Sequence, residues 1–285
     1  MDNDGPSRTA LITAYARAYH QIADHPPIFT DPMAARLLGA TAEELTELGT
    51  TDSLGLAVSD RSRRLFFAAR ARFAEDAVAA AVATGVRQVV ILGAGLDTFA
   101  YRNPLPDLRV FEVDHPATQA WKRERLTAAG IDRPETLTFV SVDFEKSTLA
   151  TGLESSGFER ADPAVFVWLG VVFYLTPDAA HATLEYIAGQ ARRVEVIFDY
   201  LQPAVGDEDR AYQQVRADRL AAAGEPVCSY FTPDDLAAQL RALGFTDLED
   251  HSAPDLVAGY LDGSVTFGGE PPRTLRANRI LRASR

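Results

Sequence analysis

The stretch Val89–Arg102, VVILGAGLDTFAYR, decides the fold of this chain. Its first four residues are apolar and predict a buried strand. The Gly93-Ala94-Gly95 turn follows, and the missing Cβ atoms there let backbone N–H groups approach a ligand closely. In an open parallel sheet, ligands bind outside the carboxyl ends of the strands. We therefore expect a binding site at this glycine turn.

Strand and helix patterns alternate after this stretch. Continuous β-branched runs separated by helical patterns are typical of a parallel sheet that is covered on both faces. The sequence therefore predicts the α/β class, with a doubly wound and mostly parallel seven-stranded sheet. Strands are expected at 88–92, 109–113, 137–142, 165–170, 194–200, 246–251 and 278–282. Helices are expected at 7–22, just after Asp31-Pro32, and at 60–84, 117–129, 147–155, 178–192, 207–223 and 232–244.

Two additions to the sheet are predicted. Residues 1–59 should form an N-terminal helical cap, and residues 60–285 the main domain. An insert at about 201–231 follows the fifth strand, which puts it over the carboxyl edge of the sheet. With 285 residues, 47% of them hydrophobic and 24% charged, the chain can bury a large core.

Composition excludes several classes of function. A net charge of -12, from 28 basic and 40 acidic residues, opposes a nucleic-acid partner. The acidic start lacks the features of a signal peptide, and the longest apolar run, 164–175, is shorter than the roughly 20 residues of a membrane span. Cys228 is the single cysteine, and the five histidines have no metal-ligand spacing. We expect a cytoplasmic protein that acts on a small molecule, with no metal and no membrane partner; the sequence makes no prediction of oligomeric state.

A second chemical signal follows the glycine turn. Asp114 ends the next strand, 21 residues after Gly93, at the offset where an acid accepts hydrogen bonds from a ribose diol. Thr98 stands where a dinucleotide motif has its third glycine, which opposes a pyrophosphate site. Asp97 adds a negative charge that suits an ammonium or sulfonium group better than a phosphate. S-adenosylmethionine carries both cations. An NAD-dependent Rossmann oxidoreductase and a non-catalytic S-adenosylmethionine-binding protein are the alternatives.

Four segments in order carry a resemblance to a known family. ILGAGLDTFAYR, FEVDHPATQAWK, SVDFEK and VWLGVVFYLTPDA resemble the class I S-adenosylmethionine-dependent methyltransferases of the leucine carboxyl methyltransferase type, and more narrowly their bacterial O-methyltransferase branch. The similarity runs from Pro6 through the fifth strand, and FTPDDLAAQLRALGF continues the general class I pattern. It implies a Rossmann-like fold and methyl transfer to an oxygen of a small molecule, in secondary metabolism.

The resemblance also implies a set of cofactor-binding residues. The glycine turn would contact the methionine part and the ribose, and an arginine before the first strand would bind the cofactor carboxylate. Arg70 is the best match for that arginine, with Arg72 as the alternative. Leu169 departs from the family, because several relatives have a glutamate there; backbone carbonyls near Trp168, or Asp97, would have to replace its contact with the ammonium group. The implied set is Arg70, Gly93, Ala94, Gly95, Asp97, Asp114 for the ribose, Asp143 and Phe144 for the adenine, Trp168 and Leu169.

The acceptor end of the site is less patterned. A carboxylate acceptor needs no proton removed, whereas a hydroxyl acceptor needs a base, for which His20, Tyr174 and Asp199 are the candidates. Aromatic side chains of the cap and the insert would suit a planar organic acceptor, and the alternative is that they only pack the core. A pocket for a protein tail, as in eukaryotic relatives, is a further alternative. The acceptor candidates are Tyr15, Tyr19, Tyr174, Tyr200, Tyr212 and Tyr230.

Overall fold

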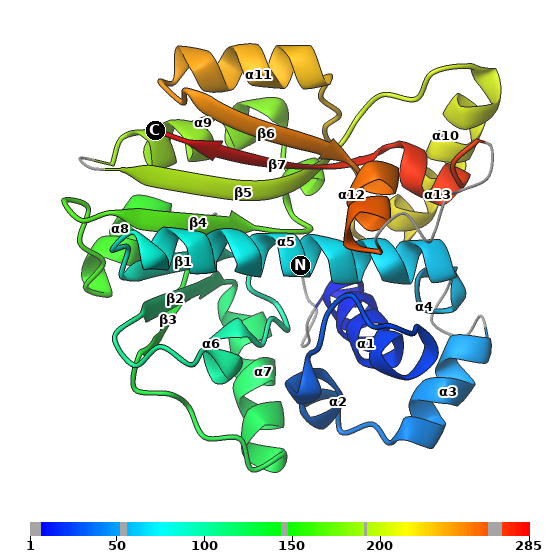
Figure 1. Cartoon of the computed structure of the whole chain (residues 1–285), viewed down its shortest axis with the longest axis horizontal. Coiled ribbons are helices and arrows are strands. Elements are labelled where there is room, and N and C mark those ends of the chain that lie inside the picture. The colour runs from blue at the N-terminus through cyan, green and yellow to red at the C-terminus, as the bar shows by residue number, and fades with distance from the viewer. Residues whose placement is uncertain (1–6, 52–55, 144–147, 191–192, 262–269) are drawn as a thin grey trace.

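A seven-stranded sheet forms the centre of the computed structural model, which describes residues 7–51, 56–143, 148–190, 193–261 and 270–285. The strand order is β3-β2-β1-β4-β5-β7-β6, and only β7 runs antiparallel to its neighbours (Figure 1). The doubly wound, mostly parallel sheet is therefore confirmed. The strands are β1 (Gln88–Leu92), β2 (Arg109–Asp114), β3 (Leu137–Ser141), β4 (Ala164–Trp168), β5 (Val194–Leu201), β6 (Asp247–Ser252) and β7 (Asn278–Ser284).

The helices that the sequence predicts are present: α1 (Arg8–Ala23), α2 (Pro32–Leu38), α5 (Arg61–Ala83), α7 (Pro116–Ala128), α8 (Leu149–Ser155), α9 (Pro177–Ala188), α10 (Asp207–Ala222) and α11 (Pro233–Ala242). Thr232 caps α11, since its side chain accepts from the backbone N–H of Asp235. Five further helices, each of nine residues or fewer, were not predicted. They are α3 (Ala42–Thr50), α4 (Leu56–Ser59), α6 (Phe99–Arg102), α12 (Ala253–Tyr260) and α13 (Arg273–Arg276).

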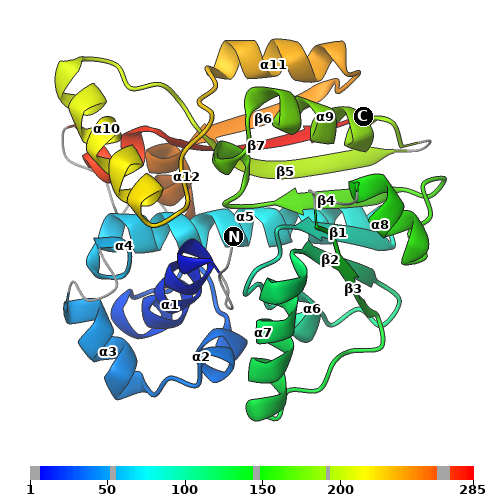
Figure 2. The ribbon, with the colours of Figure 1, turned by 180° about the vertical axis from the view of Figure 1, so that it is seen from behind.

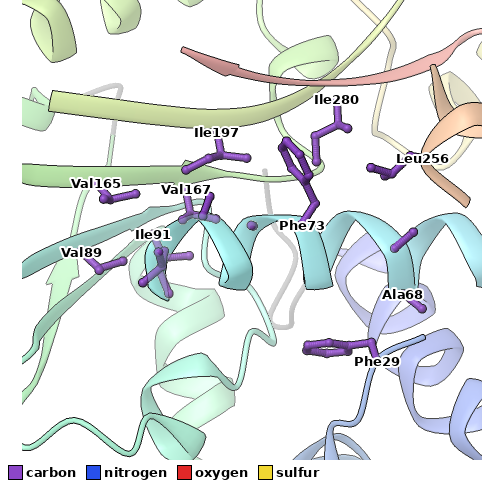
Figure 3. Close-up of a cluster of buried hydrophobic side chains, with 14 of the residues drawn as sticks. Phe29, Ala68, Phe73, Val89, Ile91, Val165, Val167, Ile197, Leu256 and Ile280 are labelled. Carbon is purple, nitrogen blue, oxygen red and sulfur yellow. The ribbon is translucent and has the colours of Figure 1, made fainter. Parts of the chain in front are cut away.

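Both faces of the sheet are covered. Figure 1 shows α5 across one face, where Phe73 and Ala68 join strand residues such as Ile91 and Ile197 in one buried cluster (Figure 3). Figure 2 shows α8 and α9 on the opposite side, where they and α11 bury a second cluster that includes Phe166. Burial on both faces explains why β1, β4 and β5 are buried at every position and mostly apolar.

The N-terminal helices α1, α2 and α3 bury a third cluster of their own beside the N-terminal half of α5 (Figure 1). Leu96 and Leu126 of the sheet domain belong to the same cluster. The N-terminal helices therefore share buried contacts with the main domain. The division into a cap of residues 1–59 and a core of residues 60–285 stays a prediction.

The fourth strand is shorter than its apolar sequence predicts. β4 ends at Trp168, and Gly170 turns the chain with φ +75° while its N–H donates to Asp199 Oδ1 at 2.5 Å. Val172–Tyr174 then form the 3₁₀ turn η1, so Tyr174 lies beyond the strand. No helix within the described ranges is long and apolar enough to cross a membrane, and no group of metal-ligating side chains is found among the same residues.

One buried ion pair lies below the predicted ribose site. Glu112 on β2 and Lys122 on α7 are each 1% exposed, with 2.6 Å between Oε2 and Nζ. Glu112 Oε1 has no hydrogen-bond partner among the described residues, and burial raises the pKa of Glu112 to about 7 against the attraction of Lys122. The fold therefore favours the neutral form of this carboxyl group.

We predict that Glu112 makes the free energy of unfolding fall as pH rises. Because the pKa of Glu112 is higher in the folded chain than in the unfolded chain, its stabilisation is complete below about pH 4 and is lost as pH rises through about 7. Denaturant unfolding from pH 5 to pH 8 should show a loss of about 2–4 kcal/mol that Glu112→Gln abolishes. The control, Glu124→Gln on the exposed side of α7, should keep the loss. An unchanged slope in Glu112→Gln would contradict the assignment.

Candidate cofactor and acceptor site

The strand order reverses between β1 and β4, the position where an open parallel sheet forms its ligand crevice. Gly93 leaves β1 here with φ +63°, and a Cβ atom on it would lie 2.4 Å from Cγ2 of Val171. Both the backbone angle and this close approach require glycine. Gly95 follows with φ +48°, and its place for a Cβ atom is 3.2 Å from the Cβ of Ala10 on α1. The turn is therefore held between the end of β4 and the N-terminal helix.

Asp114 ends β2 beside this turn. Its Oδ2 accepts a hydrogen bond from the N–H of Gly95 at 2.5 Å, and its Oδ1 accepts from the N–H of His115 at 2.7 Å. Burial raises the pKa of Asp114, and the two backbone hydrogen bonds oppose that rise. Each carboxylate oxygen keeps a second lone pair, so the group can still accept from a ribose diol. The hydrogen bonds from the turn thus fix the orientation of the Asp114 carboxylate, the group that is predicted to bind the ribose.

Asp143 follows the neighbouring strand at the same edge. The N–H of Val142 donates to the carbonyl oxygen of Asp114 at 3.0 Å, which holds the end of β3 beside the end of β2. Asp143 is half-buried. Phe144, the predicted contact with the adenine face, lies outside the described residues. Two of the three residues implied for the nucleoside therefore lie at adjacent strand ends.

Arg70 lies at the carboxyl ends of β4 and β5. Its Nη1 is 2.5 Å from Oδ2 of Asp199, and its guanidinium group lies against Gly170 and 4.7 Å from the ring centre of Phe67. Arg72 is half exposed and pairs with Asp76, away from this edge. Of the two arginines, Arg70 alone is placed to meet a cofactor carboxylate at the crevice, and Asp199 is its present partner.

The remaining cofactor candidates lie around the same edge. Asp97 is half-buried, and its Oδ1 accepts from the N–H of Phe99 at 2.7 Å. The side chain of Trp168 is buried against Phe198, so only its backbone is free to act at the crevice. Leu169 is half-buried and packs against the α5 side of the core. Ala94 donates its N–H to the carbonyl oxygen of Val113, which fixes the turn to β2.

Two of the three predicted bases are committed elsewhere. His20 is 0% exposed; its Nδ1 faces Asp24 Oδ2 at 3.0 Å and its Nε2 accepts from the N–H of Ile28 at 2.9 Å. Both ring nitrogens are used in the cap, so the structure does not favour His20 as a base, and that role stays a prediction. Asp199 accepts from Arg70 and from the Gly170 N–H, so it fixes the end of β4 and holds an arginine.

Two of the predicted acceptor contacts, Tyr200 and Tyr19, are buried side chains, and the structure does not favour them for this role. Tyr200 is 1% exposed, and its hydroxyl donates to Asp250 on β6 at 2.6 Å, inside the sheet domain. Tyr19 is buried between α1 and α3, where its ring fills the space that a Cβ atom on Gly49 would need. Both side chains serve packing, which is the alternative that the sequence left open.

Four acceptor candidates remain, and three of these tyrosines lie in or near the insert. Tyr15 is half-buried and packs on the N-terminal cluster. The Tyr174 hydroxyl donates to Thr9 Oγ1 at 2.9 Å, since the Thr9 proton goes to Glu225, and burial raises the pKa of Tyr174 to about 12. Tyr212 on α10 accepts from Nη2 of Arg63 at 3.3 Å, and Tyr230, near the end of the insert, is half-buried. Tyr174, Tyr212 and Tyr230 remain candidates for acceptor contact.

Sequence reasoning missed the groups that join the cap to the crevice. Thr9 on α1 donates its hydroxyl and its N–H to Glu225, after α10. Asp31 is 0% exposed and accepts from Arg17 at 3.1 Å and from the hydroxyl of Thr98 at 2.7 Å. The Asp31-Pro32 pair was a signal of a helix start, which is correct, but nothing local indicates that the second carboxylate oxygen binds Arg17.

The fold and the glycine turn with its strand-end acids define a class I S-adenosylmethionine-dependent methyltransferase. A sequence profile of the family described as leucine carboxyl methyltransferase matches residues 10–188. YktD of Bacillus subtilis, provisionally named as an S-adenosyl-L-methionine-dependent methyltransferase, is 32% identical over 90% of this chain and 91% of its own length. A relative in Mycolicibacterium paratuberculosis, provisionally named in the same way, is 30% identical, over 94% of each chain. The chain belongs to the leucine carboxyl methyltransferase family.

A solved structure supports the fold. The crystal structure of a protein of the duf574 family from Streptomyces avermitilis superposes with a TM-score of 0.57, over 98% of this chain and 97% of that chain, at 16% identity. The cofactor is S-adenosylmethionine, as the family and the two relatives show. The residues at the crevice fit it, because Gly93 leaves room at the turn and Asp114 presents a carboxylate to a ribose.

We predict that Asp114→Asn weakens the binding of S-adenosylhomocysteine by about 10–100-fold. Loss of a hydrogen bond to a charged group costs about 1.5–3 kcal/mol, and the amide also fails to accept from both backbone N–H groups. Titration calorimetry measures the affinity. Asp143→Ala should show a loss of similar size, whereas Asp107→Asn, before the other end of β2, should bind normally. Wild-type affinity in both site variants would contradict the assignment.

We predict that Gly93→Ala abolishes measurable cofactor binding, because the added methyl group meets Val171 and the residue must keep a positive φ. Gly130→Ala is a matched control, since its φ is +60° and no atom lies within 4 Å of the added Cβ. It should lower the unfolding free energy by about 1 kcal/mol and leave affinity for S-adenosylhomocysteine unchanged. Equal affinities in the two variants would show that the close approach at Gly93 does not matter for binding.

Proposed function

We propose that this methyltransferase moves the methyl group to an oxygen of a small molecule, and that the oxygen belongs to a carboxylate. The observation that carries the proposal is the commitment of the candidate bases. His20 uses both ring nitrogens in the cap, and Asp199 is bound by Arg70 and the Gly170 N–H. A carboxylate acceptor is already ionised at neutral pH and needs no base.

Tyr174 does not fill the role of a base. Burial raises the pKa of Tyr174 to about 12, so the phenol keeps its proton at neutral pH. Because the Thr9 hydroxyl donates to Glu225, the Tyr174 hydroxyl donates to Thr9, and it can turn its proton toward an acceptor oxygen only by giving up that contact. Its contact with Thr9 ties η1 to α1 and so holds the hydroxyl in place.

The reaction is a displacement without proton transfer. S-adenosylmethionine, when bound, supplies a methyl group on a sulfonium that is a good leaving group. A carboxylate oxygen forms the new C–O bond while the C–S bond breaks, and the electron pair of that bond stays on sulfur. The products are a methyl ester and S-adenosylhomocysteine. The task of the protein is to hold the acceptor oxygen in line, and near-attack geometry contributes several kcal/mol.

The acceptor that we propose is a small molecule rather than a nucleic acid or a membrane, and its processing would belong to secondary metabolism. The net charge of -12 opposes a polyanionic partner. The crevice is also roofed by α1, because Ala10 lies against Gly95 and Thr9 contacts both Tyr174 and Glu225. A site that is covered by a helix suits a small acceptor that the protein can surround completely.

We predict that turnover of small acids is nearly independent of pH between about 6 and 9, since carboxylates are ionised throughout this range. Tyr174→Phe should lower kcat by less than about 10-fold, whereas loss of a general base costs about 10²–10⁴-fold. The measurement is formation of S-adenosylhomocysteine and of methyl ester with a panel of small acids and phenols. Tyr186→Phe on α9, next to Arg160 and far from the crevice, is the control.

Methylation of phenols with a rate that rises with pH would contradict the proposed carboxylate acceptor. Methylation of amines or thiols in place of oxygen would contradict oxygen transfer as a whole.

A further inference from the structure

The insert helix α10 brings an arginine to the acceptor side of the crevice. A cavity of about 200 Å³ lies between α10, α13 and the chain after β5. Its charged and aromatic lining includes Asp209, Tyr212, Arg216, Arg273 and Arg276. Figure 1 shows α10 and α13 beyond the carboxyl ends of the parallel strands. The cavity therefore adjoins the end of the sheet where the cofactor binds.

The arginines of this cavity differ in their partners. Arg276 lies 2.9 Å from Asp209 and 2.8 Å from Glu270, and Arg273 pairs with Glu208. Arg216 forms no ion pair or hydrogen bond with any residue that the structure describes. It is half-buried, and Arg63, Tyr174, Tyr212 and Tyr230 lie near enough to affect its pKa.

Arg63 is the second cation of this group. Its described side-chain contact is the hydrogen bond from Nη2 to the Tyr212 hydroxyl at 3.3 Å, with no carboxylate. Burial and the nearby Arg63 lower the pKa of Arg216, although an arginine keeps its charge at neutral pH. Two half-buried cations without an anion are costly, and the cost is largest when like charges face each other. In a chain with a net charge of -12, such a pair is a marked exception.

The position of Arg63 links this pair to the cofactor site. Arg63 and Arg70 lie on the same face of α5, because seven residues make two helical turns, about 10 Å apart. Arg70 and Arg216 both act to lower the pKa of Tyr174 against the larger effect of burial, so both lie in its neighbourhood. Val171, three residues before Tyr174, touches Gly93. Arg63, through Tyr212, and Arg216 thus lie on the insert side of the crevice.

The Glu225 carboxylate is held by the N-terminal helix. Its two oxygens accept from the N–H and the hydroxyl of Thr9, and no ion pair among the described residues joins it to Arg63 or Arg216. The chain beyond it is fixed to η1, since Cys228 and Ser229 donate their N–H groups to the carbonyl oxygen of Phe173. The arrangement therefore holds a positive, phenol-lined subsite in place.

We propose that Arg63 and Arg216 form the subsite that binds the carboxylate of the methyl acceptor, an inference that rests on the proposed function. Charge-assisted hydrogen bonds from guanidinium groups suit the two oxygens of a carboxylate. Methylation turns that anion into a neutral ester, so the product loses the ionic attraction and leaves. In the transition state the carboxylate has already lost part of its negative charge. The two arginines therefore stabilise the bound substrate more than the transition state.

The experiment is titration calorimetry on the full chain saturated with S-adenosylhomocysteine. The probes are benzoate, phenylacetate and hexanoate, each compared with its amide and its methyl ester. Wild-type protein should bind at least one acid about 10-fold or more tightly than its amide and its ester, as expected for a charge-assisted contact. Arg216→Gln and Arg63→Gln should remove this preference. Arg219→Gln, an exposed arginine one turn further along α10, should keep it.

The outcomes separate this proposal from the proposed function. If no acid binds better than its amide, or if the preference survives in both Arg216→Gln and Arg63→Gln, the subsite is overturned. S-adenosylhomocysteine affinity is measured first in each variant, so a folding defect is recognised, and Arg216→Lys, which keeps the charge, should retain part of the preference. If acids bind through Arg216 but an atom other than oxygen is methylated, oxygen transfer fails and the anion subsite stands.

A kinetic readout adds a test that a structural role would not pass. For an acid of the panel that turns over, Arg216→Gln should raise KM about 10-fold or more and change kcat by less than about 3-fold, because ground-state attraction is lost. A fall in kcat with an unchanged KM would overturn the assignment of Arg216 to substrate binding.

Discussion

The buried carboxylate of Asp31 is the interaction on which the site depends. It has no exposed surface, and it accepts from Arg17 on α1 and from the Thr98 hydroxyl just after the glycine turn. Arg102 lies 3.3 Å away on its other side and is itself balanced by Glu75. Burial would raise the pKa of Asp31, but the two arginines and Thr98 hold the pKa below its ordinary value. The Asp31 carboxylate therefore stays charged in the core. Removal of one of its partners would cost several kcal/mol, because the buried charge would lose its compensation.

This network explains how a helix from the N-terminus becomes part of a site built by a sheet. Arg17 also donates to the carbonyl oxygen of Leu96 at 2.8 Å, which fixes α1 above the segment after β1. With α1 in place, Ala10 covers Gly95 and Thr9 reaches both Tyr174 and Glu225. Helix α1 is thus held over the crevice by two sets of contacts. The buried Asp31 carboxylate binds Arg17, and the hydroxyl of Thr9 contacts Tyr174 and Glu225.

The charged groups of the site form two sets, one at the predicted cofactor residues and one at the insert. On the cofactor side, Arg70 is held by Asp199, and Asp114 is held by backbone N–H groups, so each group is oriented before a ligand arrives. On the insert side, the positive charges of Arg63 and Arg216 have no such partner within the described part of the chain. The first arrangement fixes geometry, whereas the second leaves an attraction for an anion. An enzyme whose donor is already activated needs mainly these two properties.

The sequence by itself determined the sheet, the glycine turn and the strand-end acids. These features are local: a strand that is buried on both faces is mostly apolar, and a turn with positive φ selects glycine at Gly93. The 21-residue offset to Asp114 follows from the length of one turn, helix and strand. Tertiary structure alone decided the roles of His20, Asp199 and Tyr200, whose partners are Ile28, Arg70 and Asp250. It also brought Arg63 and Arg216 together from α5 and α10. Hydrogen bonds and ion pairs between distant segments leave no period or spacing in a sequence, because their partners are chosen by the packing of whole elements.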